Sequence, residues 1–247
     1  MKNLFCMALV FAMAGPACFA QADYQIWQVI YVKPKLDKLD LFRKSLAAHN
    51  KKYHPGTGPY KAAVASVITG PNSGDYIWVM GPVTWGKLDG APGEGEHITD
   101  WEKNINPNCE SIGETMYWRA VNDVRYEAPG SDTFKKTRMR ASCVHPGQMN
   151  RFIDQMKKVA EVLKQKKYSG SFSMAIREGM ASAPRPNAVT FIDFDKWAFW
   201  DTDTFNKDFE DVHGQGSFAR FLEQIDLCVD RSQTYDELTE AVSELGG

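Results

Sequence analysis

The stretch Tyr24-Gln25-Ile26-Trp27-Gln28-Val29-Ile30-Tyr31-Val32 opens a pattern that returns later in the chain. It is rich in β-branched and aromatic residues and is followed by Lys33-Pro34, which predicts a β-strand. Apolar residues then recur every three or four positions up to His49, which predicts an amphipathic helix. The same order returns as Met139–Pro146 and a helical pattern over Met149–Leu163. The sequence therefore predicts a duplicated strand–helix unit.

Each repeat continues with two more strands, another helix and a last strand. The first is predicted to have strands over 61–69, 76–80 and 114–126, with a helix over 96–106. The second is predicted to have strands over 136–144, 171–178, 188–193 and 225–233, with helices over 147–168 and 205–224. Residues 235–245 are predicted to form a C-terminal helical tail. The Pro- and Gly-containing run 127–132 marks the boundary between the repeats.

This strand-helix-strand-strand-helix-strand order resembles the ferredoxin-like arrangement, a four-stranded antiparallel sheet with both helices on one face. The other face needs a partner, because apolar sheet left in water costs about 25 cal/mol per Å². The duplicated order resembles the dimeric α+β barrel superfamily, which includes small monooxygenases and chlorite-dismutase-like haem proteins. The resemblance implies an α+β fold whose two tandem ferredoxin-like (βαββαβ) halves, residues 23–128 and 134–247, pack as an intramolecular barrel. An α+β protein without internal symmetry is the alternative.

Residues 1–22 have the form of a secretory signal peptide. Lys2 supplies the positive charge, Leu4–Ala14 is apolar, and Ala20-Gln21-Ala22 offers a small-residue cleavage site. The apolar run is short for a membrane span, and no later segment is apolar for long enough. We therefore expect a periplasmic or secreted protein with no integral membrane segment after cleavage.

Charge and motifs exclude several classes of function. The chain has 29 basic and 31 acidic residues and no dominant basic patch, which argues against nucleic acid as a partner. Phosphate-binding loops, dinucleotide-binding glycine patterns, nucleophile elbows and zinc-protease motifs are missing from the sequence.

Three cysteines follow the signal segment: Cys109, Cys143 and Cys228. The first and last strands are neighbours in a ferredoxin-like sheet, and disulfides persist in exported proteins. A Cys143–Cys228 disulfide is therefore one prediction, and two buried unpaired thiols are the alternative.

Two histidines are the candidate catalytic residues. His49 shares the register of the buried helix face, so it is either a satisfied core residue or an acid–base group. His97 follows a Gly-rich loop and lies one turn before Trp101, as at a pocket rim. His49 and His54 miss the i, i+4 spacing of a helical metal pair, and Pro55 ends the helix. The sequence therefore predicts no metal site and gives His54 a helix-capping role.

Aromatic residues suggest a flat, apolar or aromatic ligand. The chain has seven tryptophans, more than core filling requires. The candidate ligand-binding residues are Trp27, Trp85, Trp101, Trp118 and Arg119. The cofactor is left open, with haem held axially by His213 as one option.

Two functions follow from these patterns. One is an exported small-molecule-binding α+β barrel protein with monooxygenase-like or haem-assisted oxidative chemistry. The other is a non-catalytic secreted or periplasmic protein whose loop aromatics (Trp85, Trp197, Trp200) contact a protein or glycan. The sequence leaves open the ligand, whether the chain is an enzyme, and whether it forms an oligomer.

Overall fold

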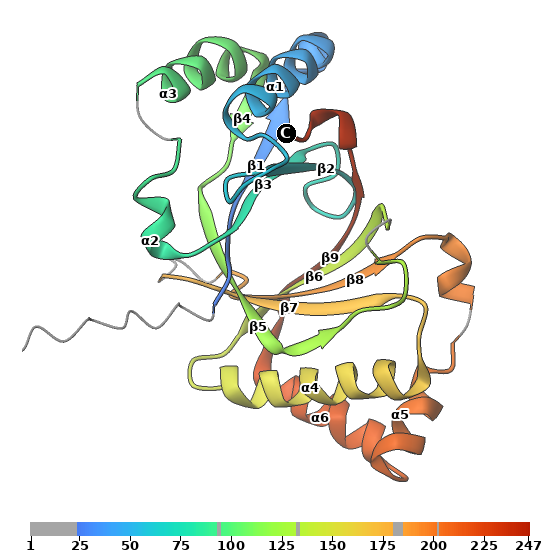
Figure 1. Cartoon of the computed structure of the whole chain (residues 1–247). Coiled ribbons are helices and arrows are strands. Elements are labelled where there is room, and N and C mark those ends of the chain that lie inside the picture. Colours follow the sequence, from blue (N-terminus) through green and yellow to red (C-terminus); the bar gives the residue numbers. More distant parts are fainter. Residues whose placement is uncertain (1–23, 93–94, 132–133, 180–184, 202) are drawn as a thin grey trace, which may run out of the picture.

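The computed structural model describes residues 24–92, 95–131, 134–179, 185–201 and 203–247. The expected signal peptide lies outside these residues. Within them, nine strands form one antiparallel sheet in the order β3-β2-β9-β6-β8-β7-β5-β1-β4, and pairing of β1 with β3 closes eight of them into a barrel. Figure 1 shows the barrel between two groups of helices. The fold is thus an α+β barrel.

The strands come from both parts of the sequence. The first part supplies β1 (Ile26–Pro34), β2 (Ala62–Thr69), β3 (Tyr76–Val83), β4 (Cys109–Ile112) and β5 (Met116–Tyr126). The second supplies β6 (Lys136–Val144), β7 (Ser171–Arg177), β8 (Ala188–Phe194) and β9 (Val229–Ala241). Pairing of β2 with β9 and of β5 with β7 joins the two parts into one closed sheet.

Continuous apolar strands are explained by burial on both faces. Successive strand residues point to opposite faces. Trp27, Val29 and Tyr31 of β1 therefore point into the barrel, whereas Ile30 and Val32 pack in the core beneath the first helix.

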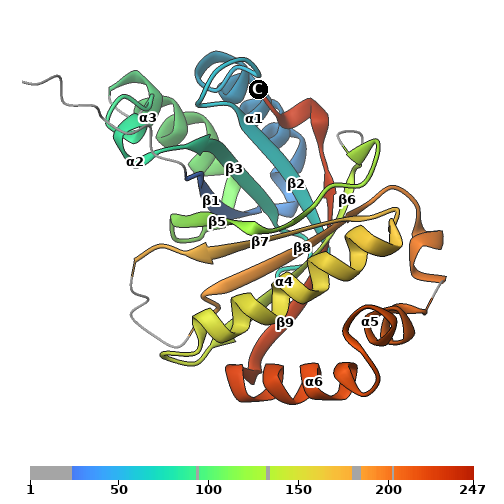
Figure 2. The ribbon, with the colours of Figure 1, turned by 60° about the horizontal axis from the view of Figure 1, so that its bottom comes forward.

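Two groups of helices cover the outer face of the barrel on opposite sides. One group contains α1 (Leu39–Tyr53), α2 (Trp85–Leu88) and α3 (Glu96–Asp100), and α3 continues as a π-helical turn over Trp101–Ile105. The other contains α4 (Met149–Lys166), α5 (Phe205–His213) and α6 (Ser217–Cys228), and Figure 2 shows this group on the side of the sheet that faces away from α1. Among the described residues, no helix combines the length and apolarity needed to cross a membrane.

The predicted C-terminal helical tail is wrong. Ile225–Cys228 belongs to α6, and β9 continues to Ala241 before a short 3-10 turn over Ser243–Leu245. Between Tyr235 and Ala241 this strand pairs with β6 and β2, which satisfies its backbone on both sides. Tertiary pairing therefore overrides the helix propensity of the Glu, Leu and Ala residues here.

The predicted disulfide is also wrong, because Cys143 and Cys228 are free thiols. Cys143 lies opposite Asp230, and the backbone N–H of His145 donates to the carbonyl oxygen of Cys228. The two cysteines are thus offset by two residues along neighbouring segments.

Candidate functional site

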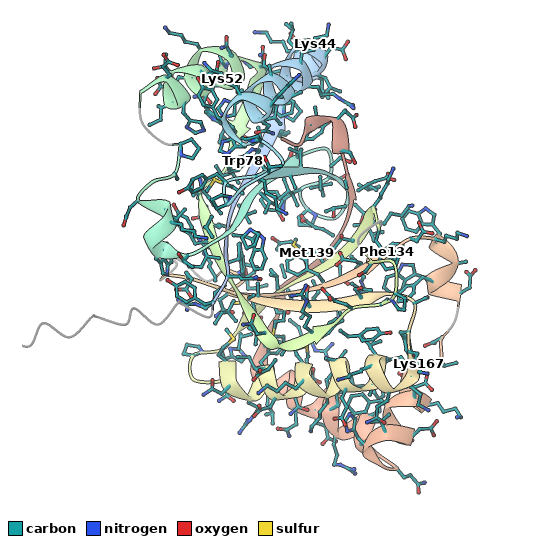
Figure 3. All side chains as sticks on the ribbon, viewed as in Figure 1. Lys44, Lys52, Trp78, Phe134, Met139 and Lys167 are labelled. Carbon is teal, nitrogen blue, oxygen red and sulfur yellow. The ribbon has the colours of Figure 1, made fainter. Side chains whose placement is uncertain are left out.

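The residues that the sequence singled out lie in two separate places. His49, His97 and Trp101 lie between the α1–α3 helices and the outer face of the barrel. Trp27 and Trp118 line the inside of the barrel. Figure 3 labels one residue of each layer, Trp78 beneath the α1 helix and Met139 inside the barrel. The single pocket predicted from the sequence is therefore divided by the sheet itself.

Three imidazoles meet in the outer layer. Nε2 of His97 lies 3.1 Å from Nε2 of His49 and 3.0 Å from Nε2 of His54. One ring nitrogen from each histidine lies within 4.8 Å of the other two. His49 and His54 are each only 1% exposed, whereas His97 is partly exposed. We call these three residues the histidine cluster.

The end of α1 brings His54 into this cluster. His54 is the C-cap residue, with φ −130° and ψ 50°, and its backbone N–H donates to Asn50. Because it has left the helical conformation, its side chain does not follow the helical direction that a five-residue spacing implies. His54 holds the C-cap position, but its Nδ1 lies 2.9 Å from the carbonyl oxygen of Tyr60, outside the helix. The predicted capping of the last helical carbonyls by its side chain is therefore wrong, and its imidazole was missed as a site residue.

The α3 helix supplies the third imidazole and a carboxylate. His97 and Asp100 are three residues apart and so share one helix face. Asp100 Oδ2 lies 2.7 Å from Nδ1 of His49, and its other oxygen accepts from Asn104 at 2.7 Å. The hydroxyl of Tyr53 donates to the carbonyl oxygen of Glu96 at 3.2 Å, which ties the start of α3 to the end of α1.

Aromatic rings enclose the histidine cluster. Trp78 meets His54 edge-on at 5.0 Å between ring centroids, and Trp101 meets His49 in the same way at 5.1 Å. Tyr53 lies 5.0 Å from His49 and 5.1 Å from His97. Trp101, predicted as a ligand-binding residue, contacts the His49 imidazole and the Trp78 ring and lines neither of the two cavities described below.

Burial lowers the pKa of all three imidazoles. It lowers the pKa of His54 to about 4, and burial together with the nearby His49 lowers the pKa of His97 to about 4. Burial also lowers the pKa of His49, although the hydrogen bond with Asp100 opposes this. Burial opposes ionisation of Asp100, but its hydrogen bonds with His49 and Asn104 outweigh this effect and lower the pKa of Asp100.

A cavity of about 930 Å³ occupies the barrel. Its walls are mainly apolar and aromatic, and they come from strands of both parts of the chain. They include Trp27, Val29, Met116, Trp118, Met139 and Phe191. Exposed Glu114 and Glu127, at opposite ends of β5, also line the cavity, so it reaches the surface.

A buried carboxylate lies behind the polar wall of this cavity. Glu237 is 0% exposed and accepts hydrogen bonds from the Tyr31 hydroxyl at 2.8 Å and the Asn72 amide at 2.6 Å. Burial raises the pKa of Glu237, although these two hydrogen bonds oppose the rise. Burial, with the nearby Glu237, also raises the pKa of Tyr31. Sequence reasoning missed all three residues because they come from β1, β9 and the β2–β3 turn, which lie close together only once the barrel is closed.

Besides Trp101, two more of the predicted ligand-binding residues do not line the barrel cavity. Trp85 packs against Tyr117 with 5.1 Å between ring centroids and remains 38% exposed. Arg119 forms an ion pair with Glu178 and lies over the Tyr24 ring. Both are accounted for by local contacts near the start of β1.

A second cavity of about 860 Å³ lies between the sheet and helices α4, α5 and α6. Several phenylalanines line it, and Arg138, Arg140 and Asp236 are among its polar residues. None of the described residues lining it is a histidine. His213 lies elsewhere, with Nε2 3.2 Å from the Lys158 carbonyl oxygen. The geometry therefore gives no support to axial haem ligation by His213.

Comparison with known proteins supports the fold alone. No family model and no curated protein matches the sequence. A monooxygenase-like protein of Fusobacterium nucleatum has a TM-score of 0.59 at 9% identity, covering 89% of this chain and 93% of that one. An anthrone oxidase-like protein has a TM-score of 0.54 at 12% identity, covering 88% and 91%. A variant chlorite dismutase of Candidatus Nitrospira defluvii has a TM-score of 0.54 at 8% identity, covering 89% and 92%.

Proposed function

We propose that this chain is an exported protein that binds a small apolar or aromatic molecule inside its barrel. The barrel cavity, at about 930 Å³, carries this proposal. Ligand pockets typically occupy about 300–1,000 Å³ and combine apolar walls with a few polar groups. Tyr31, Asn72 and Arg177 are polar groups of this kind on the wall.

The proposal includes two tandem ferredoxin-like halves. The orders β5-β1-β3-β2 and β9-β6-β8-β7 are those expected of two βαββαβ sheets. Each sheet would turn one face towards helices and the other towards its partner, and the facing pair would enclose the ligand. Export is supported by the form of residues 1–22.

Oxidation of an aromatic substrate is the reaction class that we propose for the cavity. Monooxygenase-like and anthrone oxidase-like neighbours support this class. The Tyr31 hydroxyl donates its hydrogen to Glu237, so its oxygen is free to accept a hydrogen bond from a phenolic or enolic ligand. Anthrone is a suitable probe, since O₂ converts it to anthraquinone with release of one water molecule.

The test compares cavity binding in matched variants. Native mass spectrometry of the purified chain reports any retained ligand, and anthrone binding is followed by quenching of tryptophan fluorescence. Ala120 lines the cavity, so Ala120→Phe should weaken anthrone binding at least about tenfold by filling the site. Leu227→Phe adds the same ring at a residue that is 58% exposed and should leave binding unchanged. Equal binding by the folded variants would contradict the barrel as the site.

Exposed aromatic residues favour a second candidate function, glycan or protein binding. Trp197 and Trp200 are 51% and 38% exposed and share a short 3-10 turn over Trp197–Asp201. Trp200 also packs against Arg138, with 5.2 Å between the guanidinium and the ring centroid. A glycan array probed with wild type and with Trp197→Ala tests this candidate function. It predicts that wild type binds at least one glycan and that Trp197→Ala loses this binding.

A further inference from the structure

We infer that His49, His54 and His97 form a binding site for one divalent transition-metal ion, with Zn²⁺ as the reference ion. The site lies on the opposite side of the sheet from the barrel cavity and does not depend on the function proposed for that cavity. It also revises the expectation from sequence spacing that the chain has no metal site.

The spacing of the nitrogens suits a shared ion. Zinc lies about 2.0–2.1 Å from imidazole nitrogen, so two ligands of a tetrahedral ion are separated by roughly 3.3 Å. Nε2 of His97 lies 3.1 Å and 3.0 Å from the corresponding atoms of His49 and His54. The third pair of nitrogens, from His49 and His54, lies within 4.8 Å, so these two rings would move closer together when one ion binds all three.

Hydrogen bonds on the far side of two rings decide where their lone pairs point. The Tyr60 carbonyl oxygen can only accept, so Nδ1 of His54, 2.9 Å away, carries a hydrogen. Nδ1 of His49 donates to the Asp100 carboxylate in the same way. In the neutral rings, Nε2 of both His49 and His54 is therefore a lone-pair acceptor that faces His97.

Hydrogen bonding within the histidine cluster cannot satisfy both acceptors. A neutral His97 has at most one hydrogen on Nε2, which cannot point well at two acceptors. The other tautomer brings three lone pairs together. A metal ion satisfies all three nitrogens at once.

The surroundings match those of protein metal sites. Metal-bound histidines usually donate their second N–H to a carboxylate or backbone carbonyl, which fixes ring orientation. Asp100 serves His49 in this way, and the Tyr60 carbonyl serves His54. Among the described residues, Nδ1 of His97 is buried with no hydrogen-bond partner, which leaves this ring the freest of the three to adjust.

The donor set limits the choice of ion. Three neutral imidazoles suit zinc, copper, nickel or iron, whereas magnesium and calcium prefer oxygen ligands. Three histidine ligands leave a fourth position for water or a ligand, as in catalytic zinc sites. His97 is the partly exposed member of the cluster, so this side offers the shortest access from solvent.

The experiment measures metal binding by the full chain, purified without a histidine tag and stripped with a chelator. Calorimetric titration with Zn²⁺ should show one ion per chain, and Co²⁺ should give the visible absorption of a tetrahedral nitrogen site. His97→Ala should weaken Zn²⁺ binding at least about 100-fold and remove the Co²⁺ absorption. His145→Ala, at an exposed histidine outside the histidine cluster, should change neither.

Circular dichroism checks that each variant is folded, and His97→Asn replaces His97→Ala if the smaller side chain destabilises the chain. Failure of stripped wild type to take up Zn²⁺ or Co²⁺ in a saturable way would overturn the inference. Equal Zn²⁺ affinity in wild type and a folded His97 variant would overturn it too. Because the readout is metal binding, neither result bears on anthrone binding in the barrel.

Discussion

The carboxylate of Asp100 on α3 accepts a hydrogen bond from Nδ1 of His49 on α1 at 2.7 Å. This contact fixes the tautomer of His49 and leaves Nε2 as the atom that faces the other two histidines. The negative charge also makes that nitrogen a stronger metal ligand. Asp100 is therefore a positioning residue for the proposed metal site.

Asp100→Asn should lower Zn²⁺ affinity about 10–100-fold, since carboxylates that orient metal-bound histidines have effects of this size. The amide can still accept from His49 but carries no charge. Calorimetry on stripped protein measures the change, with Glu102→Gln, an exposed residue on the following turn, as control. An unchanged Zn²⁺ affinity in Asp100→Asn would show that the contact has no such role.

The strands of the barrel could be predicted from the sequence because they are apolar on both faces. Trp27 and Ile30 could be assigned to a strand without knowing which face each would cover. The histidine cluster was harder to predict, because His54 joins it through a non-helical cap conformation and His97 through the docking of α3 on α1. Neither contact corresponds to a fixed spacing between residues that could be recognised in the sequence. The five-residue interval between His49 and His54 even argued against a metal site.

Asn50 links three segments beneath the histidine cluster. Its side-chain oxygen accepts from the indole N–H of Trp78 at 2.9 Å, and its amide donates to the carbonyl oxygen of Leu245 at 2.6 Å. Asn50→Ala should lower the free energy of unfolding by about 2–4 kcal/mol, because it leaves two buried polar groups unpaired.

Urea denaturation measures the loss, and Lys51→Ala, at the exposed neighbouring residue, provides the control. The Trp78 ring also contacts His54, so we expect weaker Zn²⁺ binding in Asn50→Ala as well. A change in the free energy of unfolding no larger than that of the control would mean that water replaces both lost partners.

Cys109, Cys143 and Cys228 should all react as free thiols in the purified protein. Intact mass should be the same with and without reductant, and alkylation in denaturant should label all three. In the native protein Cys143 should be labelled first, because it is the only one of these three that is partly exposed. Burial raises its pKa, so this labelling should be slow near neutral pH. A mass increase of about two daltons on reduction would reveal a disulfide.

Glu237 should make the barrel less stable as pH rises. Its pKa is raised by burial in the folded state, so the folded protein holds this proton at pH values where the unfolded chain has lost it. Below the ordinary pKa of glutamate, about 4.3, Glu237 is protonated in both the folded and the unfolded chain, so its ionisation does not lower the free energy of unfolding. Above it, the unfolded state is increasingly favoured until pH passes the folded-state pKa.

Glu237→Gln removes this ionisation and keeps partners for both Tyr31 and Asn72, since an amide can donate to one and accept from the other. In urea denaturation, the free energy of unfolding of the variant should equal that of wild type at pH 4. At pH 8 it should be about 1–2 kcal/mol higher, which is the usual cost of a buried polar group whose hydrogen bonding is incomplete. Glu223→Gln, at an exposed position on α6, should show no such trend. A stability difference between Glu237→Gln and wild type that stays constant from pH 4 to pH 8 would place the folded-state pKa of Glu237 at its ordinary value.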